Sequence, residues 1–485
     1  PTEVALLEMG RKADIKEDIL KEMMPRMEEI PFDSDRKLMS TKYRLHGVPT
    51  ILVKGALDIL LKRTDRIRIG DEVRPITEQD VKEILDKNQA FSEQGLRVLA
   101  FAYKEAQANQ QLTLDEEDHL IFMGLVSMID PPREESREAV SEAKRAGIRP
   151  VMITGDHKIT ATAIAEQIGI FGEGDMAVTG PELDEMSDAE LDENIEKISV
   201  YARVSPENKI RIVDAWQRKG AVTAMTGDGV NDAPALKKAD IGVAMGITGT
   251  EVSKDAASMI LTDDNFATII KAVANGRNVY RNIKNAVKFL LSGNMAGIMA
   301  VLYTSLAALP VPFQPVHLLF INLLTDSLPA IAIGMEKAEK DLLSEPPRDP
   351  KQGILTKDLM TALFVQGGLI AVCTMIAFHI GLSTDSATAS SMAFATLTLA
   401  RLFHGFNCRS RHSIFKIGLT SNIYSIGAFF GGVLLLALVI FVPVMRTLFS
   451  VSPLSGYQIG MIALLAFIPT VIIQLYKVMK EHVHA

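Results

Sequence analysis

Two aspartates four residues apart could hold a magnesium ion beside a phosphorylated group. Asp228 and Asp232 lie in the run Met225-Thr-Gly-Asp-Gly-Val-Asn-Asp-Ala-Pro-Ala-Leu236. Mg²⁺ prefers oxygen ligands and is usually held by one or two carboxylates together with a phosphate. Gly227 and Gly229 let the backbone turn sharply and approach that phosphate. An isolated pair with this spacing is more often a solvated helix face, so the whole run carries the prediction.

Two further segments could act on the same phosphoryl group. Thr154-Gly-Asp156 follows the apolar run 148–153, which reads as a buried strand, and precedes an Ala-rich helix at 160–168. A hydroxyl and a Gly-containing turn at the end of a strand can cradle a phosphate with backbone N–H groups. Lys209 could neutralise developing phosphate charge, although in isolation it reads as an ordinary surface lysine.

The elements that position these residues predict an α/β fold. The apolar run 221–225 reads as another strand and leads directly into the aspartate pair. The order of Thr154, Lys209, Asp228 and Asp232 matches the haloacid-dehalogenase-like core, a doubly wound parallel sheet. In such sheets the chemistry lies at the carboxyl ends of the strands.

Residues 1–128 read as a separate domain that could bind a nucleotide. They offer one aromatic ring, Phe32, and three cations, Lys37, Lys54 and Arg97. An aromatic ring and several cations suit an adenine ring and a triphosphate. Each residue alone also reads as core or as solvated surface. Asp130-Pro-Pro-Arg133 predicts a stiff hinge out of this domain, because proline restricts the backbone.

Composition divides the chain into a charged half and an apolar half. The 485 residues are 48% hydrophobic and 23% charged, and the charges concentrate in residues 1–283. A net charge of −8 without a dense basic patch argues against a nucleic-acid partner. Cys373 and Cys408 lie in or beside apolar segments, so we expect reduced, buried thiols and no disulfide.

Six apolar runs predict an all-α transmembrane bundle. They cover 285–309, 315–335, 358–382, 388–407, 424–444 and 456–476, each about the 20 residues that a spanning helix needs. Loops 310–314 and 381–388 carry no Lys or Arg, whereas the alternate loops carry several. This bias predicts that the charged half is cytoplasmic.

Polar residues inside the apolar half are candidates for a cation site. Asn322 and Asp326 are four apart, so on an α-helix they share one face, and Pro329 loosens the backbone nearby. Asn294 lies in the preceding span. Ca²⁺ takes six to eight oxygen ligands, which such side chains could supply. The alternative is a polar cluster that joins helices, an equally good interpretation for Asn294 alone.

Taken together, the chain resembles the C-terminal part of a type II P-type ATPase, closest to the Ca²⁺ pumps. The resemblance implies ATP-driven cation export through an aspartyl-phosphate, with ATP and Mg²⁺ as cofactors. It implies a nucleotide-binding domain at 1–128, a phosphorylation domain at 129–275 and family helices 5–10 at 276–485. The residues that it implicates are Thr2, Glu3, Phe32, Lys37, Lys54, Arg97 and Arg203 for ATP, Thr154, Gly155, Asp156 and Lys209 for the phosphoryl group, Asp228 with Asn231 and Asp232 for Mg²⁺, and Asn294, Asn322, Thr325 and Asp326 for Ca²⁺.

The sequence also departs from the family pattern. The phosphorylated Asp motif, the actuator domain and the first four spans are absent from these residues, so we expect a longer or divided polypeptide to complete the pump. Gly297 stands where a Glu would lie, and Ala400 lies near the place of another. Two missing carboxylates predict one Ca²⁺ per ATP, because desolvating a second cation would be too unfavourable. Arg401 adds a positive charge there or extends toward the cytoplasm.

Several alternatives stay open at this point. The transported ion could be Mn²⁺, Na⁺ or K⁺, or the chain could be a non-catalytic membrane fragment that only binds nucleotide. We expect a multi-pass protein of a bacterial plasma membrane, functional as a monomer with lipid and the N-terminal part of the pump as partners. An internal eukaryotic membrane is the alternative location. A long helix through 275–288 is expected to connect the two halves.

Overall fold

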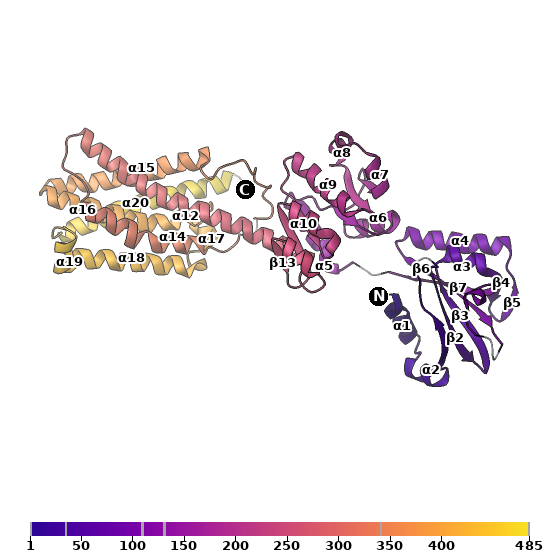
Figure 1. The fold of residues 1–485 in the computed structure, drawn as a ribbon. Helices are drawn as coiled ribbons and strands as arrows, with labels where there is room; N and C mark the ends of the chain where they lie inside the picture. Colours follow the sequence, from indigo (N-terminus) through magenta and orange to yellow (C-terminus); the bar gives the residue numbers. More distant parts are fainter. Residues whose placement is uncertain (1, 34–35, 108–110, 130–131, 340–341, 484–485) are drawn as a thin grey trace. The chain divides into compact units, whose positions relative to one another are not determined.

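The structure is a computed structural model that describes residues 2–33, 36–107, 111–129, 132–339 and 342–483. It divides into two compact units, Pro1–Lys144 with Ile148–Thr268 and Arg145–Gly147 with Ile269–Ala485. The first unit holds the charged part of the chain and the second holds the apolar helices (Figure 1). Two residues of the predicted hinge, Asp130 and Pro131, lie outside the described residues.

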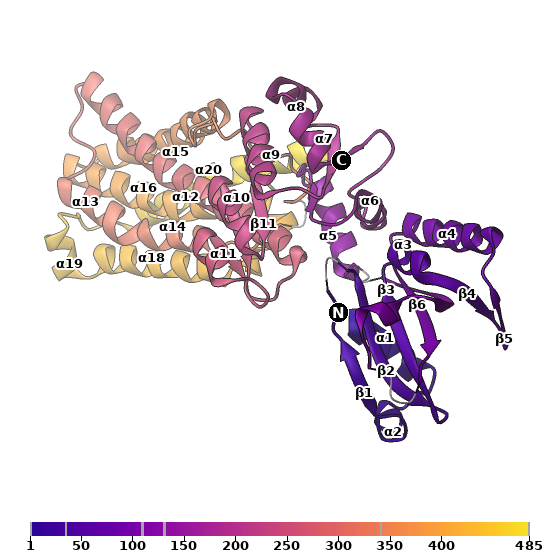
Figure 2. The same ribbon diagram turned by 45° about the vertical axis from the view of Figure 1, so that its right-hand side comes forward.

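A mixed sheet forms the first part of unit 1. In the described residues it has seven strands in the order β1-β2-β3-β6-β7-β4-β5. Neighbouring strands are antiparallel except β4 and β7, which are parallel. Helices α3 and α4 pack on β6 (Figure 2). The bounds are α1 (Thr2–Lys12), α2 (Glu17–Met23), β1 (Arg26–Ile30), β2 (Leu38–Leu45), β3 (Val48–Gly55), α3 (Leu57–Leu60), η1 (Leu61–Arg63), β4 (Thr64–Ile69), β5 (Glu72–Pro75), α4 (Glu78–Glu93), β6 (Arg97–Glu105), η2 (Leu114–Glu117) and β7 (Leu120–Met128).

The second part of unit 1 alternates short parallel strands with helices. Among the residues described, β8, β10 and β9 form one parallel sheet and β11, β12 and β13 form another. Every residue of β10 is buried, as expected for a central parallel strand. The elements are α5 (Glu134–Arg145), β8 (Met152–Thr154), α6 (Lys158–Gln167), β9 (Met176–Thr179), α7 (Gly180–Glu185), α8 (Asp188–Asn194), β10 (Ile198–Ala202), α9 (Pro206–Arg218), β11 (Ala224–Gly227), η3 (Val230–Asp232), α10 (Ala233–Lys238), β12 (Ile241–Met245), α11 (Glu251–Ala256) and β13 (Met259–Leu261).

Two predicted strands are shorter than expected. The run 148–153 forms strand only from Met152, because Pro150 has no N–H for a ladder bond. The run 221–225 becomes strand only at Ala224, since the backbone N–H of Thr223 donates to Oδ2 of Asp240 at 2.8 Å instead. The helix expected at 160–168 is confirmed as α6.

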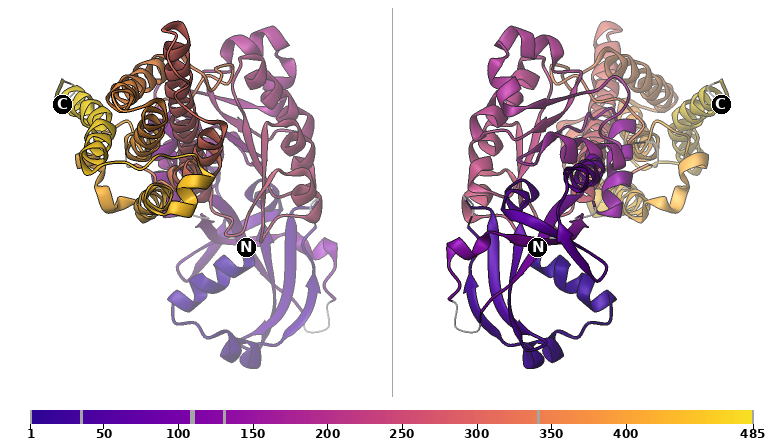
Figure 3. Two further views of the ribbon diagram at one scale, coloured as in Figure 1. Left: turned by 90° about the vertical axis from the view of Figure 1, so that its left-hand side faces the viewer. Right: turned by 90° about the vertical axis from the view of Figure 1, so that its right-hand side faces the viewer.

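Unit 2 is a bundle of helices, seen partly end-on in Figure 3. Its first helix, α12, runs unbroken from Phe266 to Leu306, so the predicted long helix is confirmed. The other elements are α13 (Pro315–Leu319), η4 (Phe320–Thr325), α14 (Ser327–Gly334), α15 (Lys357–Leu382), α16 (Ser386–Cys408), α17 (Ile414–Ile417), η5 (Leu419–Ser421), α18 (Ile423–Phe441), α19 (Pro443–Leu448) and α20 (Gly456–Val483).

Five helical segments in the described part of unit 2 are long and apolar enough to cross a membrane. They are α12, the segment Pro315–Gly334, α15, α18 and α20. The fourth predicted run, 388–407, is helical as α16 but is not among them. Helix α16 is instead the buried centre of the bundle, where it packs on α15, α18 and α20. Its many Ala, Ser and Thr residues suit that place, because small side chains let helices approach closely.

The second predicted span is not a regular α-helix. It consists of α13, a π-helical turn (η4) and α14. The N–H of Asp326 donates to the carbonyl oxygen of Ile321 at 3.0 Å, five residues back. Pro329 cannot donate to Thr325, four residues earlier, because its nitrogen has no hydrogen. The expected loosening of the backbone near Pro329 therefore takes the form of a π turn.

Candidate functional site

The predicted Mg²⁺ run forms a tight turn after β11. Asp232 is buried, and its Oδ1 accepts a hydrogen bond from Nζ of Lys209 at 2.5 Å. Its Oδ2 accepts from the backbone N–H groups of Asp228 at 3.2 Å and Gly229 at 3.0 Å. A Cβ on Gly227 would lie 2.7 Å from Cγ of Asp232, so only glycine fits there.

The electrostatics of Asp232 follow from these contacts. Burial by itself would raise the pKa of this carboxyl group, but the bond to Lys209 and the backbone N–H groups outweigh burial and lower the pKa. Asp232 is thus held as a carboxylate, and its oxygens bond to groups within the protein. It fixes the turn that carries Asp228.

Asp228 presents the opposite picture, since its side chain is exposed while its backbone is fixed. Its carbonyl oxygen accepts from the N–H of Thr250 at 2.8 Å and from Oγ of Ser253 at 3.1 Å. Asn231, three residues on, is also exposed. No group of three or more His, Cys, Asp or Glu side chains gathers as a metal site in the described residues. A metal here would complete its coordination with water or phosphate, as Mg²⁺ commonly does.

Thr154 lies at the end of β8, beside β10. Its Oγ1 accepts from the N–H of Asp156 at 3.1 Å and donates to Oδ2 of that residue at 3.1 Å. Gly155 and Asp156 are exposed. Arg203 closes the turn, since its N–H donates to the carbonyl oxygen of Asp156 at 3.2 Å. Ile153 packs in the apolar cluster that contains Met225 of β11, so β8 and β11 share a core.

The predicted nucleotide residues form two contacting pairs on the large sheet. Lys54 on β3 pairs with Glu3, and Nη1 of Arg97 on β6 donates to Oγ1 of Thr2 at 3.3 Å. Strands β3 and β6 are neighbours, so both pairs join the start of α1 to one region of the sheet. Phe32 is 61% exposed, so its ring is available to a planar ligand.

Lys37, also predicted to contact nucleotide, stands before β2 in a left-handed conformation with φ of 58°. Nearby is a residue that sequence reasoning missed. The carboxylate of Glu117 is fully buried and bonds to Arg36 and Ser40, and to Arg63 at 3.3 Å. No sequence signal distinguishes Glu117 from the other acidic residues beside it. Only the folded structure shows that its carboxylate joins Arg36, Ser40 and Arg63.

The candidate cation site in unit 2 is an ion pair. Asp326 and Arg401 are 2% and 3% exposed, and Nη2 of Arg401 bonds to Oδ2 of Asp326. The same nitrogen donates to Oδ1 of Asn294 at 3.2 Å. Oδ1 of Asp326 is buried without a hydrogen-bond partner among the described residues. Of the two fates predicted for Arg401, the one inside the bundle is confirmed.

The other predicted cation ligands do not all join this pair. Thr325 is buried, and its Oγ1 donates to the carbonyl oxygen of Ile321 at 3.1 Å. Asn322 is exposed whereas Asp326 is buried, so the expectation that they share one face is wrong. The π turn explains the difference, because an extra residue in the turn changes the angular relation between residues before and after it.

A second buried ion pair lies at the end of α16. Nε and Nη2 of Arg409 donate to the two carboxylate oxygens of Glu336 at 2.8 and 2.9 Å. Nδ2 of Asn422 donates to the same carboxylate at 2.8 Å, and Nδ2 of Asn282 donates to the carbonyl oxygen of Glu336 at 2.8 Å. The pair joins α12, α14, α16 and α18.

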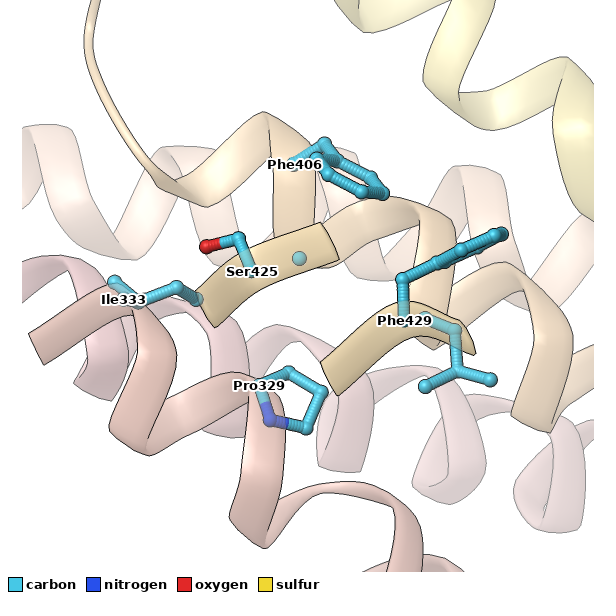
Figure 4. Close-up of a pocket in the computed structure, with 7 residues that line it drawn as sticks. Pro329, Ile333, Phe406, Ser425 and Phe429 are labelled. Atoms are coloured by element: carbon cyan, nitrogen blue, oxygen red, sulfur yellow. The ribbon is translucent and has the colours of Figure 1, made fainter. Parts of the chain in front are cut away.

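One small cavity lies between α14, α16 and α18. Figure 4 shows Pro329, Ile333, Phe406, Ser425 and Phe429 around it. The lining is apolar apart from Ser425, so it offers no carboxylate to a cation. The cluster of Asp326, Asn294 and Arg401 is the better candidate.

Comparisons with known proteins match separate families to the charged and the apolar parts of the chain. The family described as "P-type ATPase, cytoplasmic domain N" matches residues 1–135, and "Cation transporting ATPase, C-terminus" matches residues 310–479. Calcium-transporting ATPase 1 of Lactococcus lactis is 48% identical over 99% of this chain and 55% of its own length. A calcium-transporting ATPase of Listeria monocytogenes is 47% identical over the same shares. Human calcium-transporting ATPase type 2C member 1 is 37% identical over 94% of this chain and 49% of its own length. The chain thus spans about half the length of these relatives.

Proposed function

Because this chain belongs to the P-type ATPases, we propose that it is part of a pump that exports Ca²⁺ through an aspartyl-phosphate cycle. The observation that carries the proposal is Asp326, a carboxylate buried among apolar helices with one oxygen unpartnered in the described residues. Ionisable groups inside a membrane are unfavourable and mark ion pathways. The names of the relatives support Ca²⁺ as the ion.

Three domains share the work in this proposal. Residues 1–128 bind ATP through Thr2, Glu3, Lys37, Lys54 and Arg97, with adenine against Phe32, and Arg203 of the next domain also contacts ATP. Residues 129–275 form a haloacid-dehalogenase-like phosphorylation domain, and residues 276–485 supply six spanning helices with α16 at their centre. The soluble domains face the cytoplasm, in a bacterial plasma membrane, and the rest of the pump supplies the phosphorylated Asp. The exposed Phe32 and the contacting pairs on β3 and β6 support the nucleotide role.

At the phosphoryl site each residue has a distinct task. Asp228 and Asn231 hold Mg²⁺, which supplies positive charge to the transferring phosphoryl group. Lys209 and Asp232 fix the turn, and Lys209 also places a cation near the phosphate. Thr154, Gly155 and Asp156 bind phosphoryl oxygens at the end of β8. An exposed Asp228 on a fixed backbone supports this assignment.

The Arg401–Asp326 pair supports one Ca²⁺ per ATP. Two unit charges 4 Å apart interact by about 4 kcal/mol at an effective dielectric constant of about 20. The guanidinium of Arg401 therefore repels any further cation beside Asp326. It supplies the positive charge that a second Ca²⁺ would otherwise bring. Gly297 and Ala400 add no carboxylate to offset this repulsion. Asn294 and Thr325 supply the further oxygens around the single ion, and the exposed Asn322 is left out.

Helix α12 is the proposed connection between ion binding and phosphorylation. It is continuous from Phe266 to Leu306 and carries Asn294. Ala286→Pro would interrupt it, because proline removes a hydrogen bond and clashes with the preceding turn. Phosphorylation should then lose its dependence on Ca²⁺, and unchanged dependence would contradict the connection.

Phosphorylation by radiolabelled ATP tests the function. The protein that carries this chain should form an acid-stable phosphoenzyme only with micromolar Ca²⁺, and Asp326→Asn should lose it or need more Ca²⁺. Ser327→Ala, an exposed neighbour, is the matched control. A response to Mn²⁺, Na⁺ or K⁺ alone would replace the ion. No phosphoenzyme with any cation would favour a non-catalytic membrane component.

A further inference from the structure

Gly293 on α12 lies directly against the side chain of Arg401 on α16. A Cβ on Gly293 would collide with Nε, Cζ and Nη2 of Arg401, the last at a distance of 2.7 Å. Gly293 is buried in the middle of α12, where glycine is unfavourable to a helix by about 1 kcal/mol relative to alanine. A glycine at such a position usually has a packing reason, and here the reason is the guanidinium of Arg401.

The helices cannot easily move apart to relieve such a collision. Next to Gly293, Oγ of Ser292 lies 2.9 Å from Nε2 of His404, and both residues are buried. His404 also stacks on Phe289, with ring centroids 6.5 Å apart. These contacts fix α12 against α16 one turn from Arg401. An added side chain at Gly293 must therefore displace Arg401 itself.

We propose that Gly293 is a positioning residue that seats Arg401 against Asp326 and so keeps the space beside Asp326 closed to a second cation. The inference rests on the proposed function, since it concerns the number of Ca²⁺ ions that the same site binds. Gly293 acts only through Arg401. Its missing side chain lets Nη2 reach both Asp326 and Asn294.

Gly297 provides an internal control. It lies on the same helix, four residues further along, and a Cβ there would meet only Cδ2 of Leu397, at 4.0 Å. That is ordinary van der Waals contact. Gly293→Ala and Gly297→Ala are therefore the same chemical change in the same helix, and they differ in whether the new methyl group reaches Arg401.

The experiment compares Gly293→Ala, Gly297→Ala, Arg401→Met and the double variant Gly293→Ala/Arg401→Met in the membrane-embedded protein that carries this chain. Equilibrium binding of radioactive Ca²⁺ gives affinity and stoichiometry. Removing a positive charge from beside Asp326 should tighten Ca²⁺ binding about tenfold or more in Gly293→Ala and Arg401→Met. Gly297→Ala should stay within about twofold of the unmodified protein, since its new methyl group would meet only Leu397, in ordinary van der Waals contact.

The double variant separates positioning from general packing. If Gly293 acts through Arg401, adding Gly293→Ala to Arg401→Met should change nothing, because coupled residues are not additive. An equal shift in both backgrounds, or equal behaviour of the two alanine variants, would overturn the inference. If Gly293→Ala alone fails to fold, recovery of a monodisperse protein in the double variant supports the inference, and failure there contradicts it.

The same data distinguish the inference from the function on which it rests. Normal Ca²⁺ binding by the unmodified protein, with no response in Gly293→Ala, would contradict the inference alone. Absence of Ca²⁺ binding by the unmodified protein would contradict the proposed function, and the inference would fail with it.

Discussion

Lys209 and Asp232, 23 residues apart in the chain, form a partly buried hydrogen bond of 2.5 Å between α9 and the turn after β11. The other oxygen of Asp232 accepts two backbone N–H groups, so both carboxylate oxygens already have partners within the protein. The two aspartates of the run therefore differ in task. Asp232 shapes the turn, and Asp228 faces solvent at its surface.

Asp228→Asn should weaken the response to Mg²⁺ and leave stability unchanged. Its side chain is exposed, so the free energy of unfolding should change by less than about 0.5 kcal/mol. The lost negative charge should raise the Mg²⁺ concentration needed for phosphorylation. A Mg²⁺ titration of phosphoenzyme, with a thermal unfolding curve alongside, measures both effects. An unchanged titration would remove Asp228 from the site.

Asp232→Ala should destabilise the first unit. It leaves the N–H groups of Asp228 and Gly229 and the ammonium of Lys209 without their acceptor, and each buried group left unsatisfied loses about 1–3 kcal/mol. Thermal unfolding should occur at lower temperature than in Asp228→Ala, the exposed neighbour. Equal curves for the two variants would contradict a structural role for Asp232.

Asp264 should make the loop after β12 sensitive to strong acid. The N–H of Ile247 chiefly, with those of Thr248 and Gly246 and the hydroxyl of Thr248, lowers the pKa of Asp264 to about 2, although desolvation opposes this shift. An unfolded Asp has a pKa of about 3.9. Since the folded pKa is the lower one, the stabilisation is complete above about pH 3.9 and disappears as the pH falls through about 2.

Amide hydrogen exchange checks this loop directly. The N–H groups of Gly246, Ile247 and Thr248 should be protected at pH 5 and lose protection near pH 2. In Asp264→Asn, which cannot carry the charge, their protection should be weaker at pH 5 and independent of pH over this range. Unchanged protection in that variant would show that the loop does not depend on Asp264.

Breaking the Glu336–Arg409 pair should be severe, and removing it whole should be milder. Glu336→Met or Arg409→Met alone leaves one buried charge, which is unfavourable by about 3–5 kcal/mol. The double variant Glu336→Met/Arg409→Met leaves none and should be more stable than either single variant. Denaturation of each variant in detergent, followed by the helical signal in circular dichroism, gives the stabilities to be compared. A double variant as unstable as the sum of both singles would contradict the argument.

Features that depend on local sequence could be predicted. The long helix through 275–288 is α12, and the helix expected at 160–168 is α6. Both cysteines are free and buried, as expected. The family was also correctly predicted, because the run around Asp228 is long and specific. Each of these properties depends on a few neighbouring residues, so hydrophobic periodicity and sequence motifs are enough to predict them.

Features that depend on contacts between residues far apart in the chain could not be predicted from the sequence. Arg401 and Asn294 are 107 residues apart, and no spacing in the sequence announces that α12 and α16 touch at Gly293. Burial of Glu117 and Arg409 likewise needs the packed fold. The two aspartates of the Mg²⁺ run looked equivalent, since a spacing of four does not say which carboxylate turns inward. The π turn was missed because no residue type in Phe320–Thr325 is specific to such a turn.

That π turn makes the direction in which Asp326 points depend on how many residues precede it. An α-helix rotates by about 100° for each residue, and a π turn accommodates one residue more than an α turn. Deleting any one residue from Phe320–Thr325 would let the segment close into regular α-helix and swing Asp326 about 100° away from Arg401. An insertion in this segment, or a deletion of one of its apolar residues, would therefore change the site without removing any of the predicted ligands.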